Sequence, residues 1–446
     1  MSEPKEISAP EPEISNRQIF RFYLPLALSW IFMAIESPIA ISVISRMANS
    51  EINQAAFQPL MALALLIESP VIDLLTTSTT LGKDRQHYEQ LSRFVWKMMG
   101  LVTVVHALVA LTPLYWVVTL DIINLDLEVA KAARLGLMIM VPWSAFIGWR
   151  RYLQGILIRN GQTRLIGYGT AIRMATMGVV CIGLFQLASL PSITIVALAL
   201  LASVAAEATF AHFASRPVIR ERLAFDDPSL KPLTQRFLAH FHLPLTATTL
   251  ITILSQPLVS TALARSPESI LSLASFQVAS SIIWLHRTIV FALPEVIITL
   301  YKDGRNDAKL KRFCLIIGFA TSGVLALTAV TNLDSWIFRA VLGVTNERTI
   351  QTAHLCLVMS CFLPFLGALQ SYLRGVLAAH HLTVSRLAAI FVGLACMVIC
   401  LIVGVALKWP GVVTASVALT VSQFAELVIL AKAWRTGKAK LAAAHA

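Results

Sequence analysis

A short motif that occurs twice constrains this chain more than any other feature. The stretch RFYLPL at positions 21–26 is followed, 219 positions later, by HFHLPL at positions 240–245. The same offset pairs Pro38 with Pro257 and Arg46 with Arg265, and it pairs Glu207 with Glu426. A slightly larger offset pairs YLQG, which begins at Tyr152, with YLRG, which begins at Tyr372. Because the matches keep their order, we predict two copies of one unit, a duplication typical of transporter folds.

The composition places these copies in a membrane. Of the 446 residues, 57% are hydrophobic and 13% are charged, whereas a soluble domain carries about 25% charged residues. A span needs about 20 mostly apolar residues, and only helices satisfy the backbone in lipid at that length. We therefore predict an all-α integral membrane protein. Its expected spans are 20–46, 52–80, 94–120, 129–158, 165–187, 191–215, 234–264, 268–301, 310–331, 350–378, 384–406 and 410–436.

The lysines and arginines predict the orientation. With the N-terminus inside, 24 of the 36 fall in inner segments or at the inner ends of spans, seven in outer segments or at the outer ends of spans, and five further within spans. Positive loops stay in the cytoplasm, so we expect both termini there, in a bacterial inner membrane. The net charge of +12 then faces anionic lipid, and no nucleic-acid partner is expected.

Six spans in each copy mean that both copies enter the membrane from the same side. We expect a monomer of two parallel six-helix lobes. The predicted divisions are a cytoplasmic tail (1–17), an N-terminal lobe (18–215), a linker with turns (216–233), a C-terminal lobe (234–436) and a second tail (437–446).

Ionisable groups within spans are costly and mark functional positions. Glu36 and Glu68 each begin a Glu-Ser-Pro triplet near the middle of a span, where a proline kink beside a carboxylate suits a proton or ion. Asp73 and Glu295 are further candidates for ion coupling. The paired Glu207 and Glu426 suit a structural bond between helices equally well.

The arginines within spans are candidates for binding an anion, because guanidinium stays charged and pairs with carboxylate or phosphate in bidentate geometry. Arg287 lies too deep in its span to extend to the surface. Arg173, Arg374 and Arg151 complete the predicted substrate-binding set, although Arg150 and Arg151 also suit an arginine that extends toward the inner surface.

The sequence shows no catalytic motif. It has no HExxH, no GxSxG and no Walker A sequence, so we expect neither an enzyme nor an ATP-driven pump. The six cysteines lie in apolar runs without ligand spacing, and no metal or other cofactor is expected beyond a coupling proton or sodium ion.

The FxLPL motif opening each copy, and a proline followed by Tyr-Leu-x-Gly in spans four and ten, resemble the multidrug/oligosaccharidyl-lipid/polysaccharide (MOP) exporter superfamily. Within it, the chain is similar to members on the border of the MATE exporters and the progressive ankylosis (ANK) family. The ANK resemblance rests on positions 22–26, 56–73 and 362–375. The resemblance implies a V-shaped molecule with a central cavity that exports solute by alternating access. It places Glu36 where MATE exporters often have an acid, and the ANK branch is associated with pyrophosphate, nucleotide or citrate.

The leading hypothesis is therefore an ion-coupled secondary exporter of organic or phosphate-containing anions. A proton- or sodium-coupled exporter of cationic drugs and a flippase for lipid-linked sugars remain alternatives. The major facilitator fold also has two parallel six-helix halves, but its Gly-Arg pattern after span two is missing here. A non-transporting scaffold would not need ionised groups buried in both halves.

Overall fold

The computed structural model describes residues 14–187, 189–301, 306–380 and 383–445, and every regular element within these ranges is a helix. The first copy contains α1 (Asn16–Ala34), α2 (Glu36–Ser45), α3 (Ser50–Ile72), α4 (Leu74–Leu81), α5 (Arg85–Leu111), α6 (Leu114–Trp116), the π-helix η1 (Val117–Ile123), α7 (Leu127–Ile139), α8 (Trp143–Arg159), α9 (Thr163–Leu187) and α10 (Ser192–Arg222). The second contains α11 (Gln235–Ile253), α12 (Ser255–Ala264), α13 (Ser269–Val290), α14 (Leu293–Leu300), α15 (Asp307–Val330), α16 (Leu333–Trp336), the π-helix η3 (Ile337–Val341), α17 (Glu347–Ser360), α18 (Leu363–Ala379), α19 (Thr383–Ala406) and α20 (Gly411–His445).

The described helices provide eleven candidate membrane spans, or twelve when one bent pair of helices counts as a single span. Eleven stretches of the described chain are long and apolar enough to cross a membrane, and α7 with α8, bent by 47° at their junction, form the twelfth. The predicted class, an all-α protein of twelve spans in two six-helix copies, is confirmed.

Prolines divide the same spans in both copies. Pro38 follows the break between α1 and α2, and Pro257 follows the break between α11 and α12. Pro142 stands at the break before α8, and Pro364 lies in the first turn of α18. Proline lacks the N–H that continues a helix, and its ring collides with the carbonyl four residues earlier. A proline thus accounts for each of these breaks, although Pro25, Pro59 and Pro217 lie inside continuous helices.

The glycine of the repeated Tyr-Leu-x-Gly motif has a packing role. A Cβ on Gly155 would lie 2.6 Å from the carbonyl oxygen of Leu75, and one on Gly375 would lie 2.7 Å from Ile297. Both distances are shorter than a van der Waals contact. The motif thus lets α8 lie directly against α4, and α18 against α14.

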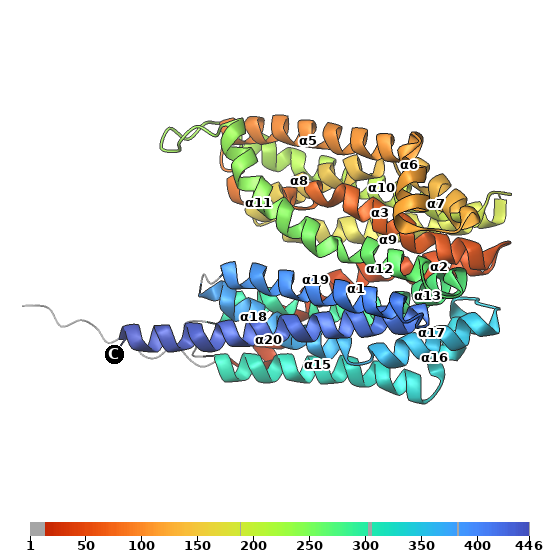
Figure 1. Cartoon of the computed structure of the whole chain (residues 1–446). Coiled ribbons are helices and arrows are strands. Elements are labelled where there is room, and N and C mark those ends of the chain that lie inside the picture. Colours follow the sequence, from red (N-terminus) through yellow and green to blue (C-terminus); the bar gives the residue numbers. More distant parts are fainter. Residues whose placement is uncertain (1–13, 188, 302–305, 381–382, 446) are drawn as a thin grey trace, which may run out of the picture.

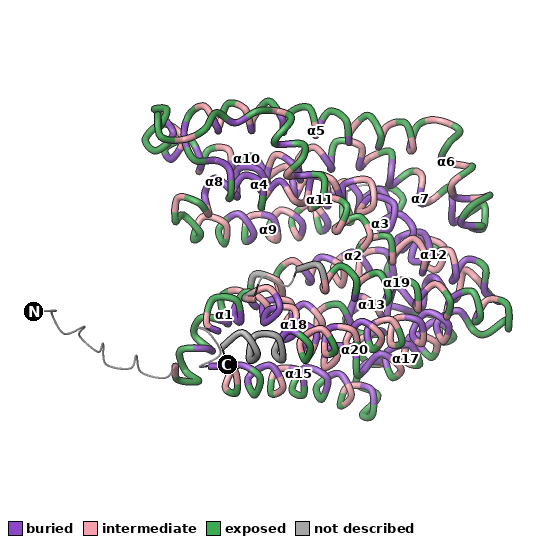
Figure 2. The backbone as a smooth tube through the Cα atoms, turned by 60° about the vertical axis from the view of Figure 1, so that its left-hand side comes forward, coloured by how far each residue is buried: buried purple, intermediate pink, exposed green. Residues whose placement is uncertain are grey.

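The spans form two lobes that approach each other at one end and diverge toward the end at which both termini lie (Figures 1 and 2). Helices α3 and α13 pack against each other along the line where the lobes meet, which we call the seam. The end with the termini is called the termini end, and the other is called the far end.

The half of the first span nearest the termini packs, in each copy, on the opposite copy. Ile19, Tyr23 and Ala27 of α1 belong to a hydrophobic core built otherwise from helices of the second copy. Tyr23 donates from its hydroxyl to the carbonyl of Ile289 at 2.8 Å. At the equivalent position of α11, the ring Nε2 of His242 lies 2.8 Å from the carbonyl oxygen of Pro70. This exchange links the two copies through matching hydrogen bonds.

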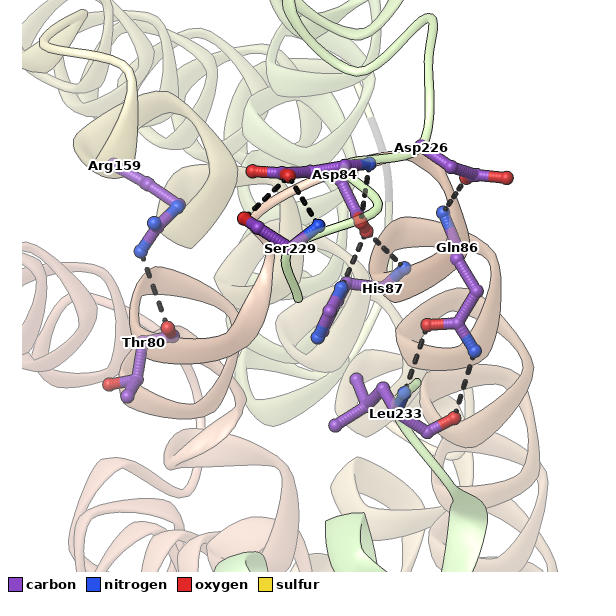
Figure 3. A network of polar contacts seen from close by, with 9 residues as sticks. Thr80, Asp84, Gln86, His87, Arg159, Asp226, Ser229 and Leu233 are labelled. Carbon is purple, nitrogen blue, oxygen red and sulfur yellow. Dashed lines mark hydrogen bonds and ion pairs between the residues drawn. The ribbon is translucent and has the colours of Figure 1, made fainter. Parts of the chain in front are cut away.

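The chain between the copies docks on the start of α5 (Figure 3). The side chain of Gln86 donates to the carbonyl of Leu233 and accepts from its N–H, both at 3.0 Å. Asp226 accepts from the Gln86 N–H at 2.8 Å. Asp84 accepts from the N–H of His87 at 2.8 Å and of Asp227 at 3.1 Å. The linker is therefore fixed to the first copy. The second-copy residues equivalent to Lys83-Asp84, which are Lys302-Asp303, lie outside the described residues.

Candidate functional site

Six ionisable side chains gather inside the first lobe, and we call them the N-lobe cluster. They are Glu36, Glu68, Arg150, Arg151, Arg173 and Glu207. Glu36 is the first residue of α2, directly after the proline-induced break, so the kink brings its carboxylate to the lobe interior. The other members come from α3, α8, α9 and α10.

Ion pairs neutralise most of this cluster. Arg173 donates to both oxygens of Glu36, with the Nη2–Oε2 distance at 2.6 Å. Arg150 donates to Glu207 at 2.6 Å, and Arg173 lies 3.6 Å from the same oxygen. Removing an ion from water costs several kcal/mol, which only a close partner offsets. The chain Glu36–Arg173–Glu207–Arg150 therefore joins four helices through their charges.

Glu68 and Arg151 remain outside that chain. Glu68 is only 4% exposed and lies in the electrostatic field of Arg150, Arg151 and Arg173. Its Oε2 has no hydrogen-bond partner within the described part of the protein, nor do Arg151 Nε, Arg150 Nε and Arg173 Nη1. Buried polar atoms without partners are rare in proteins, and three of these four, all but Arg173 Nη1 with its 3.6 Å contact to Glu207, have none among the described residues.

The second lobe holds a related group, the C-lobe cluster, made of Arg287, Gln370, Arg374, Gln423 and Glu426. Arg374 donates from Nε to Glu426 at 2.9 Å. Gln370 donates to the carbonyl of Gln423 at 2.8 Å. Arg287 donates to the Gln423 amide oxygen at 2.5 Å when that amide is oriented to satisfy both of its neighbours. In the ranges covered by the structure, no carboxylate forms an ion pair with Arg287.

The two clusters have the same arrangement, except that the arginine and the glutamine exchange positions. In the first lobe, Arg150 and Gln154 both donate to Glu207. In the second, Gln370 and Arg374 occupy the equivalent positions and both approach Glu426. Each paired glutamate thus accepts from one arginine and one glutamine a helical turn apart, in opposite order along the chain.

The structure brings together residues for which the sequence predicted separate roles. Arg173 and Arg151 share the N-lobe cluster with Glu36 and Glu68, while Arg287 and Arg374 lie near Glu426. Asp73, at the junction of α3 and α4, and Glu295, exposed in the first turn of α14, belong to neither cluster. Among the residues that the structure describes, no group of three or more His, Cys, Asp or Glu side chains could hold a metal ion.

At the far end, two arginines cross the seam in equivalent ways, and we call them the outer clamp. Arg46, after α2, donates to the carbonyls of Ala340 and Val341 at 3.1 and 2.9 Å. Arg265, after α12, donates to the carbonyl of Ile122 at 2.5 Å. The acceptors belong to η3 and η1, the π-helices of the opposite copies.

A glycine makes room for the clamp. Gly343 has a φ of +73°, and a Cβ there would lie 2.7 Å from Arg46 Nη1. The equivalent residue, Asn124, has a φ of 69°. Glycine is favoured where both a left-handed backbone and a close approach are needed.

Sequence reasoning paired Arg46 with Arg265 but gave them no role, and it missed Gln154 and Gln423 as cluster members. A signal was present, because Gln154 lies in the repeated Tyr-Leu-x-Gly motif. Neutral amides within spans are less conspicuous in a sequence than charged residues, although they form hydrogen bonds to the same buried groups.

No protein-family model and no curated protein matches the sequence, whereas solved structures match nearly all of the chain. A multidrug resistance MATE family transporter of the MOP superfamily, in its inward-facing conformation, has a TM-score of 0.69 at 12% identity, covering 93% of this chain and 99% of that one. The lipid II flippase MurJ, in an inward closed conformation, has a TM-score of 0.67 at 12% identity, covering 92% and 87%. A MOP superfamily transporter from Pyrococcus furiosus has a TM-score of 0.64 at 14% identity, covering 97% and 99%.

The protein thus has the fold of the MATE and other MOP superfamily transporters. The more specific prediction of the ANK branch stays a prediction.

Proposed function

We propose that this protein is a secondary transporter of the MOP type that works by alternating access. The observation that carries the proposal is the outer clamp, which joins the lobes at the far end while they diverge at the termini end. A transporter in its inward-open state needs this combination, closed outside and open inside. The charge distribution supports a cytoplasmic location for both termini.

We further propose that the transported solute is an organic or phosphate-containing anion. Arg287 supports this, since it lies within a span and its described partner is an amide rather than a carboxylate. Arg151 is a second such arginine, because no ion pair involves it among the described residues. An anion would supply the ion-pair partner that both lack. Arg173 and Arg374 are already paired, and we assign them a supporting role.

Glu68 is our candidate for the coupling ion. Its carboxyl group is buried beside three arginines and has one oxygen without a partner. Gain or loss of a proton there changes the net charge of the N-lobe cluster by one unit, which alters its attraction for an anion. Glu36 is held by Arg173, so releasing it requires breaking a buried ion pair. Asp73 and Glu295 remain secondary candidates.

Two other solutes suit this fold. One neighbour is named a multidrug transporter and another a lipid II flippase. A third is described as having a binding pocket of reversed polarity that suggests a different function. The fold therefore does not decide the sign of the solute's charge. The arginines without an ion pair are what favour an anion.

Transport of labelled pyrophosphate and citrate into inverted vesicles tests the proposal, with a proton gradient imposed or collapsed. We expect uptake above that of empty vesicles, reduced at least tenfold by Arg287→Gln and unchanged by Arg312→Gln, an exposed arginine at the start of α15. Transport of a cationic dye, with no anion uptake, would instead support the drug exporter. Movement of a lipid-linked sugar between leaflets would support the flippase.

A further inference from the structure

A groove on the outside of the first lobe has a chemistry that the transport proposal does not use. It lies between α5, α8 and α10 and has a volume of about 410 Å³. Its lining includes the apolar side chains Trp96, Met99 and Trp149 and the basic side chains His212, Arg216 and Arg220. Trp96 is 62% exposed, so one wall of the groove faces sideways, toward the surrounding lipid.

The polar and apolar parts of the groove are ordered by depth. Arg216 and Arg220 lie in the last two turns of α10, at the termini end of the bundle. Trp96 lies 11 residues into α5, which starts at the same end, about 16 Å from the start of that helix at 1.5 Å per residue, whereas Arg216 lies six residues, about 9 Å, from the end of α10. The basic side chains thus lie nearer the termini end than Trp96 does.

The two arginines are available to a ligand. Arg216 donates to the ring Nε2 of His212 at 3.0 Å and lies over the ring of Phe213 at 4.8 Å. These contacts orient its guanidinium and leave other N–H groups free to donate. Arg220 is exposed and has no ion pair or hydrogen bond to any described residue. None of the side chains that line the groove is acidic.

We propose that this groove binds an anionic glycerophospholipid from the leaflet at the termini end. The phosphate accepts hydrogen bonds from Arg216 and Arg220, because guanidinium groups match phosphate in bidentate geometry. One acyl chain lies against the apolar side chains of Trp96, Met99 and Trp149. Basic pockets between spans on the cytoplasmic side are suited to such headgroups. Free phosphate would use only the basic end.

Native mass spectrometry of the full chain, released from nanodiscs of phosphatidylglycerol and phosphatidylcholine, tests the proposal. We expect one phosphatidylglycerol to remain bound to the wild type in preference to phosphatidylcholine. The double variant Arg216→Gln/Arg220→Gln should retain at least tenfold less phosphatidylglycerol than the wild type. Arg216→Lys/Arg220→Lys should retain part of it. Arg93→Gln, which removes an exposed arginine of α5 outside the groove, should retain all of it.

Equal retention by the wild type and the double glutamine variant would overturn the proposal, as would equal retention of the two lipids by the wild type. Competition with glycerol 3-phosphate separates the possible sources of phosphate. We expect millimolar glycerol 3-phosphate to leave the lipid bound, and displacement of the lipid would assign the site to soluble phosphates. Because no side chain that lines the groove belongs to either cluster, this result does not depend on the transport assay.

Discussion

Glu68 and Arg287 occupy equivalent positions in the two copies, 219 residues apart, on the helices α3 and α13 that pack together at the seam. Glu68 faces the arginines of its own lobe, and Arg287 lies near Arg374 and Glu426 of the other. One duplicated position thus carries opposite charges. The N-lobe cluster has three acids and three arginines, whereas the C-lobe cluster has two arginines and one acid.

The paired glutamates should differ in their importance for stability. Glu207→Gln leaves Arg150, whose side chain is 4% exposed, buried without its charge partner, at a cost of about 3–5 kcal/mol. Glu426→Gln affects Arg374, whose side chain is 32% exposed and keeps access to water, so its cost should be clearly smaller. Thermal unfolding in detergent measures both. An equal loss of stability in the two variants would contradict the assignment.

The exchanged order of arginine and glutamine leads to a second prediction. Arg150→Gln alone should destabilise the first lobe, because Glu207 loses its closest cation. Adding Gln154→Arg recreates the order found in the second lobe and should recover at least half of the lost stability. A double-mutant cycle on unfolding temperature checks this, and strictly additive losses would argue against equivalent clusters.

The docked linker should loosen in acid. Burial raises the pKa of the Asp84 carboxyl, but hydrogen bonds from the backbone and ring of His87 and from the N–H of Asp227 outweigh it and lower the pKa below its ordinary value. A lowered pKa means that the folded state favours the carboxylate. Its stabilising effect is therefore complete above the unfolded pKa, near 4, and is lost as the pH falls through the folded value.

Hydrogen exchange of positions 225–235 between pH 7 and pH 3 measures this effect. Protection should fall toward pH 3 in the wild type. In Asp84→Asn it should already be low at pH 7 and should vary less with pH. Strong protection of the linker at pH 7 in that variant would show that Asp84 does not hold it.

Much of the fold could be predicted from the sequence, because apolar length, proline position and internal repetition act locally. Pro38 and Pro257 marked real helix breaks, and the lengths of the apolar segments predicted the spans. The partners of the charged residues could not be predicted in this way. Glu36 and Arg173 are 137 positions apart, and their pairing depends on how α2 meets α9. The packing of Tyr23 on the opposite copy likewise depends on the tertiary arrangement, since its motif reads the same in either lobe.

The outer clamp provides the most direct test of alternating access. Spin labels introduced through an unnatural amino acid at positions 127 and 333, at the far end of the two lobes, report its opening by pulsed electron resonance. Each arginine of the outer clamp stabilises the closed far end by about 1 kcal/mol, because its charge-assisted hydrogen bonds are exposed to solvent. Losing both should therefore shift the equilibrium between the closed and the open far end more than tenfold. We predict one short distance in the wild type and in Arg348→Gln, whose pairing with Glu268 stays within one lobe. We predict a second, longer distance in Arg46→Gln/Arg265→Gln, and an unchanged distribution in that double variant would contradict the account.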